Sequence, residues 1–185
     1  CGDFLLKRRL IEKKGVVVTH ASTIGIEKFF KERGCEVIRT EIGDRYVVEA
    51  MLKQGFQLGG EKSGHTVFLN YSTTGDGLIT SLQLLNVMIN ENSPLSALSS
   101  IFEKPYEFSI DIPVKTKIPL ENIKGYDRFK KDMDSKINSG RIYIRYSGTE
   151  PKLRILVEGY DEENVKSIGK EIREFFLKNL DLAEE

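Results

Sequence analysis

The stretch "RYSGTEPKLR", residues 145–154, joins two segments in which apolar and polar residues alternate. Alternation with a period of two is typical of β-strands that bury one face. The run between the segments is rich in turn-forming residues, so the strands are expected to pair as an antiparallel hairpin. The apolar positions, expected to face the core, are Ile142, Ile144, Tyr146, Leu153, Ile155 and Val157. Arg145 and Arg154 would then flank the loop on one side, away from the core.

The loop itself carries groups that bind oxyanions. Arg145 and Arg154 flank it with two guanidinium groups, and Ser147 and Thr149 add hydroxyl donors. Gly148 is expected to let the backbone turn so that successive N–H groups converge. A phosphate accepts hydrogen bonds from all of these donors at once. The alternative is an ordinary hairpin turn with solvated charges, and the spacing alone does not separate the two interpretations.

The segments around the hairpin predict a small α+β domain over residues 105–185. Residues 107–114 form a further predicted strand and residues 126–137 a helix. Asp161 can cap a last helix, whose apolar residues share one face: Val165, Ile168, Ile172, Phe175 and Phe176. An antiparallel sheet with helices on one face fits this order of elements.

Residues 1–102 predict a different architecture, an α/β domain with a mixed sheet between helices. Helices are expected at residues 5–14, 26–33, 44–54 and 76–90, and strands at residues 16–19, 36–40, 56–58 and 66–69. The segment 76–90 is apolar nearly all round. A helix of that kind is expected to be buried between layers.

Composition narrows the class of protein. Lys plus Arg and Asp plus Glu are equal at 28 each, so no global charge points to nucleic acid or an acidic membrane as a partner. The apolar stretches are too short to span a bilayer, and Cys1 and Cys35 have no metal-binding spacing. A cytoplasmic protein without disulfides is the expectation. Because a buried strand follows soon after Cys1, the chain is expected to be a piece of a longer protein.

A second loop, "GGEKSGH" at residues 59–65, carries groups that suit sugar hydroxyls. The carboxylate of Glu61 can accept hydrogen bonds from two neighbouring hydroxyls, and Ser63 can donate or accept. His65 can exchange protons near neutral pH. Taken alone, each of these side chains also fits a solvated or structural role.

Both loops resemble motifs of the α-D-phosphohexomutases. The run from Arg145 to Pro151, followed by Arg154, resembles the loop of the last domain that holds the phosphate that is not transferred. "GEKSGH" is similar to the sugar-recognition loop of the third domain. The resemblance implies that Glu61 and Ser63 bind sugar hydroxyls, and that His65 lies near the reacting oxygens as a candidate catalytic group. It covers essentially the whole chain, as the last two of four domains.

Two further stretches resemble the phosphoglucosamine mutase branch of that family: "GDRYV" at residues 43–47 and "TTGDG" at residues 73–77. By this likeness Gly43, Asp44 and Arg45 belong to a second sugar-contacting loop. Asp44 and Asp76 also suit the N-terminal cap of a helix, and for Asp76 only that role is expected.

The resemblance also implies a reaction. In this family a phosphoryl group moves between a phosphoserine and a hexose or hexosamine phosphate through a bisphosphate, and an aspartate-rich loop holds Mg²⁺. The chain has neither a serine followed by His-Asn-Pro nor a D-G-D-x-D-R run. The phosphoserine and the Mg²⁺ site are therefore expected in missing N-terminal domains, with no metal site in this chain and no activity of the chain alone. A phosphomannomutase or phosphoglucomutase of the same superfamily, and a non-enzymatic phosphosugar-binding module, stay open as alternatives.

Overall fold

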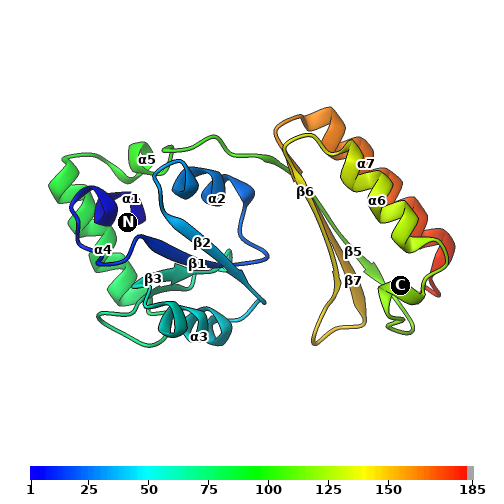
Figure 1. Ribbon diagram of the computed structural model, residues 1–185, viewed down its shortest axis with the longest axis horizontal. Coiled ribbons are helices and arrows are strands. Elements are labelled where there is room, and N and C mark those ends of the chain that lie inside the picture. The colour runs from blue at the N-terminus through cyan, green and yellow to red at the C-terminus, as the bar shows by residue number, and fades with distance from the viewer. Residues whose placement is uncertain (183–185) are drawn as a thin grey trace. The chain divides into compact units, whose positions relative to one another are not determined.

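The computed structural model describes residues 1–182, which divide between Glu103 and Lys104 into two compact units (Figure 1). The first unit contains a mixed sheet of order β2-β1-β3-β4. Strand β1 (Gly15–Thr19) pairs in parallel with β2 (Glu36–Thr40) and β3 (Leu58–Gly60). Strand β4 (Thr66–Phe68) runs antiparallel to β3. The helices of this unit are α1 (Gly2–Lys7), α2 (Ile24–Lys31), α3 (Asp44–Gln54), α4 (Gly77–Glu91) and α5 (Leu95–Leu98).

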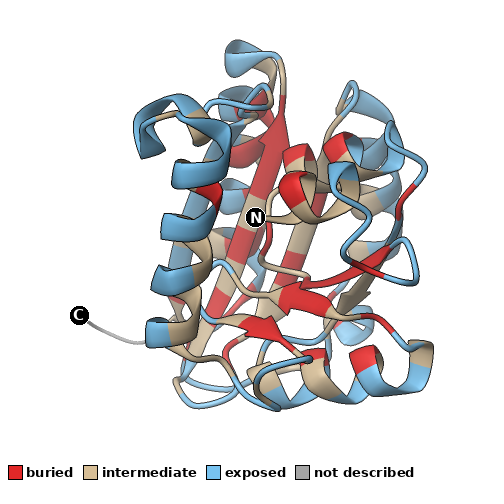
Figure 2. Ribbon diagram, turned by 90° about the vertical axis from the view of Figure 1, so that its left-hand side faces the viewer, coloured by how far each residue is buried: buried red, intermediate tan, exposed pale blue. Residues whose placement is uncertain are grey.

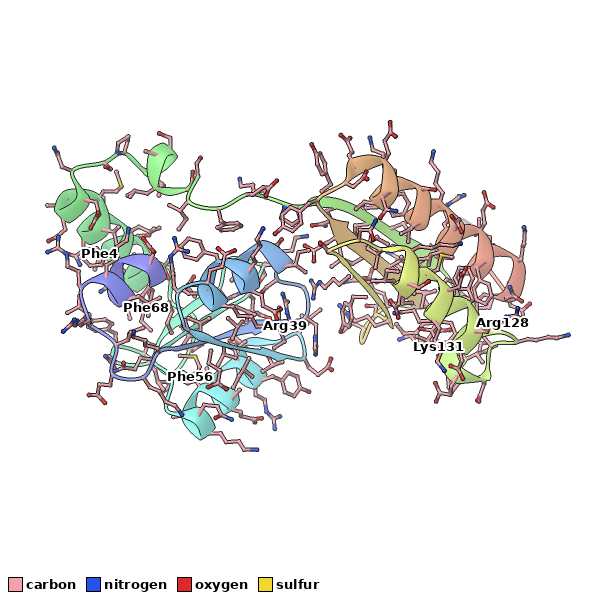
Figure 3. The ribbon with its side chains drawn as sticks, turned by 45° about the horizontal axis from the view of Figure 1, so that its top comes forward. Phe4, Arg39, Phe56, Phe68, Arg128 and Lys131 are labelled. Atoms are coloured by element: carbon pink, nitrogen blue, oxygen red, sulfur yellow. The ribbon has the colours of Figure 1, made fainter. Side chains whose placement is uncertain are left out.

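The first sheet is covered by helices on both faces, because neighbouring residues of β1 point to opposite sides. Val17 packs with Val47 and Met51 of α3 on one face. Val16 packs on the other face with partly buried residues of α1 and α2. Figure 3 labels Phe56 and Phe68, one from each of these clusters. The predicted α/β class with a mixed sheet is confirmed.

Two boundaries predicted for this unit are wrong. The helix expected at residues 5–14 ends at Lys7, because Arg9 takes a left-handed φ of 55° that interrupts the helix. The strand expected at residues 56–58 is instead Leu58–Gly60, so two glycines of the expected loop belong to the strand. A Cβ on Gly59 would lie 2.6 Å from the sulfur of Met51, which explains a glycine inside a strand.

Helix α4 is not buried between layers, contrary to the prediction. Only Val87 is fully buried, and Asp76 caps the helix by accepting a hydrogen bond from the Ile79 N–H at 2.9 Å. An apolar stripe along the helix is exposed, with exposed fractions of 79%, 64%, 51% and 77% at Leu78, Leu82, Leu85 and Ile89. The reason is geometric: within this unit the helix has one neighbouring layer, and a single layer covers only one side of a helix.

The second unit is an antiparallel sheet of order β5-β7-β6 with helices on one face. Its elements are β5 (Tyr106–Pro113), the short 3-10 helix η1 (Leu120–Asn122), α6 (Tyr126–Lys136), β6 (Arg141–Tyr146), β7 (Lys152–Gly159) and α7 (Glu162–Asn179). Ile144, Ile155 and Ile172 belong to the core between the sheet and the helices. Asp161 caps α7 by accepting from the Asn164 N–H at 3.0 Å. The predicted hairpin and α+β class are confirmed.

Burial follows these layers. Buried residues gather on the strands and the inner sides of the helices, while the outer helix faces are exposed (Figure 2). Arg128 and Lys131 of α6 extend from such an outer face (Figure 3). Among residues 1–182, no helix has the length and apolar character needed to cross a membrane.

Candidate functional site

A row of three charged residues crosses the face of the second sheet that the helices leave open. Arg145 on β6 lies directly opposite Arg154 on β7, and Arg154 lies opposite Asp111 on β5. The alternate residues Ile144 and Ile155 are buried in the core, so the predicted direction of both arginines is confirmed. Like charges directly opposite each other destabilise an antiparallel pair. A bound anion would relieve the repulsion between the two guanidinium groups.

The two arginines differ in what they contact. Arg154 faces carboxylates on two sides, with its Nε 3.6 Å from Asp111 and its Nη2 2.5 Å from Glu150. Arg145 donates from Nη1 to the carbonyl of Tyr146 at 3.1 Å. In the part of the chain that the structure describes, Arg145 forms no ion pair. Its charge is therefore available to an anion from solution.

The loop between the strands is closed by its own hydrogen bonds. The Ser147 N–H donates to the carbonyl of Lys152 at 2.8 Å. Ser147 is buried, and its Oγ accepts from the Glu150 N–H at 3.3 Å. The ammonium of Lys117 donates to the Ser147 carbonyl at 2.6 Å. Ser147 thus holds the loop in shape, while Thr149 at the tip is exposed.

The structural reason expected for Gly148 is wrong. Its φ lies outside the positive region, which Gly125 and Ser139 adopt in this unit. A Cβ built on Gly148 would meet no atom within 4 Å. The turn is made by the hydrogen bonds of Ser147, so neither backbone conformation nor space requires a glycine at position 148.

Glu150 is held by two cations of the loop. Its Oε1 lies 3.0 Å from the Lys152 ammonium, and its Oε2 lies 2.5 Å from Arg154. The hydrogen bond from Lys152, followed by that from Arg154, lowers the pKa of the Glu150 carboxyl below its ordinary value. The carboxylate is therefore ionised at neutral pH.

Sequence reasoning missed three charged groups of this loop. Lys117 reaches it from 30 residues upstream, and nothing in the sequence pattern indicates that contact. Glu150 and Lys152 lie within the loop stretch at residues 145–154. The opposite charges of Glu150 and Arg154, close in sequence, are a weak signal of their ion pair, because a spacing of four brings side chains together only on a helix.

In the first unit the structure brings the two predicted sugar loops together. The Gly43 N–H donates to Oε1 of Glu61 at 2.8 Å. Gly43 precedes α3, and Glu61 follows β3 directly. The Glu61 side chain is 9% exposed, and its carboxylate is held where the two loops meet.

Ser63 and His65 surround the second oxygen of Glu61. Ser63 Oγ lies 3.4 Å from Glu61 Oε2 and 3.0 Å from His65 Nδ1. The same His65 nitrogen lies 3.8 Å from Glu61 Oε2. The loop is closed by the Glu61 N–H, which donates to the His65 carbonyl at 2.9 Å, and Gly64 turns it with a φ of 97°. A carboxylate, a hydroxyl and an imidazole thus meet within one turn.

The two charged residues that follow Gly43 are placed differently. Asp44 Oδ1 accepts from the Arg45 N–H at 2.8 Å, and Asp44 Oδ2 accepts from Thr74 Oγ1 at 3.4 Å. The second contact brings in the "TTGDG" segment. Arg45 is 79% exposed and pairs with Glu49 at 2.9 Å, which raises the pKa of Arg45. Its guanidinium is therefore not part of the Glu61 cluster.

A pocket of about 340 Å³ lies beside this cluster. It is lined by apolar residues of β1 and β3, by residues at the starts of α1 and α2, and by residues that follow the strands, among them Ser22, Thr23, Glu61 and Lys62. Ligands of open α/β sheets bind beyond the carboxyl ends of parallel strands. The Glu61 cluster is at such an end.

Among residues 1–182, no three His, Cys, Asp or Glu side chains gather closely enough to hold a metal ion. Cys1 and Cys35 are free thiols. Binding of oxyanions and hydroxyls is what the two loops can do chemically.

Comparison with known proteins agrees with this geometry. The family pattern described as "Phosphoglucomutase/phosphomannomutase, alpha/beta/alpha domain III" matches residues 1–105. The pattern "Phosphoglucomutase/phosphomannomutase, C-terminal domain" matches residues 84–175. The chain belongs to the phosphoglucomutase/phosphomannomutase family. Its two units therefore carry the folds of the third and last domains of a phosphohexomutase.

Relatives within the phosphohexomutases are named phosphoglucosamine mutase. The protein of Myxococcus xanthus (strain DK1622) is 42% identical over 181 residues, which are 97% of this chain and 40% of that protein. The protein of Nitratidesulfovibrio vulgaris (strain DSM 19637 / Miyazaki F) is 40% identical over 184 residues, with the same coverage. The chain thus spans about 40% of the length of these relatives.

Solved structures show the same fold. Aspergillus fumigatus N-acetylphosphoglucosamine mutase in complex with glucose 1,6-bisphosphate has a TM-score of 0.79 at 15% identity, over 95% of this chain and 41% of that one. N-acetylglucosamine-phosphate mutase in a substrate complex has a TM-score of 0.77 at 19% identity, over 94% of this chain and 41% of that one. Both are described as phosphosugar mutases, and at this identity the likeness shows the fold alone.

Proposed function

We propose that the chain is the substrate-binding half of a phosphoglucosamine mutase, which interconverts glucosamine 6-phosphate and glucosamine 1-phosphate. The observation that carries the proposal is the pair of arginines directly opposite each other, beside a loop of hydrogen-bond donors. Relatives named phosphoglucosamine mutase align over 97% of the chain and support the choice of sugar.

The second unit binds the phosphate that is not transferred. Arg145 and Arg154 donate charge-assisted hydrogen bonds to its oxygens. The Thr149 hydroxyl and the N–H groups at Gly148 and Thr149, at the tip of the loop, complete the set of donors. Ser147 holds the loop and donates through its hydroxyl hydrogen, because its oxygen already accepts from Glu150.

The first unit binds the sugar. Glu61 accepts hydrogen bonds from sugar hydroxyls on Oε2, since Oε1 is held by the Gly43 N–H. Ser63 shares that oxygen, and His65 stands beside it as the group that can take or give a proton. Gly43, Asp44 and Arg45 form the second sugar-contacting loop, in which Asp44 is held by Thr74.

The phosphoryl donor and the metal belong to other domains of the same protein. A phosphoserine passes its phosphoryl group to the sugar phosphate and forms a bisphosphate. The bisphosphate reverses its orientation in the site, and its other phosphoryl group returns to the serine. Mg²⁺ supplies charge neutralisation for the transferring group. In this chain the described residues position the substrate, which is a large part of phosphoryl transfer catalysis. The protein acts in the cytoplasm on a small substrate, without nucleic acid or membrane.

The test is an assay of an intact protein that contains this chain. With Mg²⁺ and a trace of the matching bisphosphate, glucosamine 6-phosphate should turn over with a higher kcat/KM than mannose 6-phosphate or glucose 6-phosphate. A preference for either hexose would assign the protein to the phosphomannomutase or phosphoglucomutase activity of the family. No turnover of any of the three sugars, with binding retained, would assign it as a non-enzymatic phosphosugar-binding module.

A further inference from the structure

We propose that Glu150 is an internal competitor of the phosphate, whose carboxylate occupies the cations of the loop until phosphate displaces it. This inference rests on the proposed phosphate site. It gives Glu150 a role in setting the affinity of that site, beyond the donors that bind the ligand.

Glu150 contacts one of the two arginines assigned to the phosphate, Arg154, and the neighbouring cation Lys152. One carboxylate oxygen lies 3.0 Å from the Lys152 ammonium, and the other lies 2.5 Å from Nη2 of Arg154. Both oxygens are therefore used, each on a different cation. A phosphate presents its oxygens to the Arg154 guanidinium in the same way. Glu150 therefore occupies one of the two N–H groups of Arg154 Nη2, and the phosphate has to compete with a carboxylate for this end of the guanidinium.

The surroundings of Arg154 indicate that Glu150 competes with the phosphate and is not needed to position Arg154 for it. Nε of Arg154 also faces Asp111 across the strand pair at 3.6 Å, so the direction of the guanidinium does not depend on Glu150 alone. The Glu150 side chain is 41% exposed, and it can swing into solvent without breaking the core. If it stayed in place, its charge would repel an incoming phosphate, because like charges at short range disfavour each other.

The phosphate prevails because it carries more charge. A phosphate monoester has a charge of about −1.5 to −2 at neutral pH, against −1 for a carboxylate. It can also reach Arg145, which Glu150 does not contact and which forms no ion pair with any residue that the structure describes. Because Glu150 stays tethered beside Lys152 and Arg154, it reoccupies them once the phosphate leaves. The result is a site that binds phosphate more weakly than its cations alone would.

The test is calorimetric titration of the 185-residue chain with inorganic phosphate, comparing the parent with Glu150→Gln. Removing the competing charge should tighten binding about two- to fivefold, the range that an exposed ion pair supports. A gain in affinity separates competition from a structural role, because loss of a structural contact would weaken binding. The control is Glu162→Gln. Glu162 pairs with Lys166 at 2.5 Å with the same spacing of four and a similar exposure of 47%, on helix α7.

The outcomes separate this inference from the proposed function. Tighter binding by Glu150→Gln, with no gain for Glu162→Gln, supports the inference. Equal or weaker binding by Glu150→Gln, with the parent binding phosphate, overturns the competitor role and leaves the phosphate site in place. An equal gain in both variants also overturns it, since the effect would then be one of net charge. No phosphate binding by the parent or Glu150→Gln overturns the site and the inference together.

Discussion

Arg145 offers the sharpest perturbation of the phosphate site. Replacing it by alanine removes one of two guanidinium groups that lie directly opposite each other on the open face of the second sheet. It leaves no carboxylate newly unpaired among residues 1–182, since Arg145 forms no ion pair there. The variant should therefore lose binding and keep its fold.

The expected size follows from the contacts. Each charge-assisted hydrogen bond to the phosphate is worth roughly 1.5–3 kcal/mol, so the dissociation constant should rise about tenfold to 150-fold. Stability should change by no more than about 1 kcal/mol, because the side chain points away from the core and its loss relieves a like-charge contact. For a domain of this size that corresponds to a shift in Tm of no more than about 8 °C.

The assay is calorimetric titration with inorganic phosphate, with thermal melting of the same samples. Arg173→Ala is the matched control, since Arg173 is an exposed arginine on the outer face of α7. It should leave both phosphate affinity and Tm near the parent values. If Arg145→Ala binds phosphate as tightly as the parent, the two arginines do not form an anion site. A Tm lower by about 16 °C or more, twice the allowed shift, would mean that Arg145 has a structural role instead.

Three further predictions test other parts of the account. Glu61→Gln keeps an oxygen for the Gly43 N–H but replaces the acceptor at Oε2, so the chain should bind glucosamine 6-phosphate several-fold more weakly. Its affinity for inorganic phosphate should be unchanged, and an equal loss of affinity for both ligands in calorimetry would contradict the sugar role. Glu158→Ala should lower the free energy of unfolding in urea by roughly 3 kcal/mol, because Glu158 is 1% exposed and accepts a hydrogen bond from Arg141 Nε at 2.7 Å. A decrease below about 1 kcal/mol would show that the buried ion pair is dispensable for stability. The 185-residue chain alone, incubated with glucosamine 6-phosphate, Mg²⁺ and a trace of the bisphosphate, should form no glucosamine 1-phosphate; turnover above a no-protein blank would place a phosphoryl donor within it.

Local patterns predicted those parts of the fold that depend on near neighbours in sequence. The alternation around the 145–154 loop predicted both strands and the direction of the arginines, because side-chain parity is fixed by the strand itself. Asp161 and the apolar spacing after it predicted α7, because a helix cap and a helical periodicity are also local features of the sequence. The Glu61 loop could be singled out by its chemistry, although its contact with Gly43 spans 18 residues.

Failures occurred where the outcome depends on distant parts of the chain or on a single dihedral angle. The apolar residues of α4 indicated burial, yet periodicity cannot show whether a second layer exists to cover them. Arg9 ends α1 by a positive φ that its residue type does not favour. Lys117 meets the Ser147 carbonyl only because the chain after β5 passes the loop. Gly148 was assigned a conformational reason that its backbone does not have.

The central claim is that the loop at residues 145–154 binds the phosphate of a sugar phosphate. The most direct measurement is a two-dimensional NMR titration of the ¹⁵N-labelled 185-residue chain with glucosamine 6-phosphate, following the backbone amides and the Nε–H signals of Arg145 and Arg154. The account predicts saturable shifts at residues 147–152 and at both arginine Nε–H signals, with the same set shifted by inorganic phosphate. Shifts confined to the first unit, or none in this loop at saturating ligand, would contradict it.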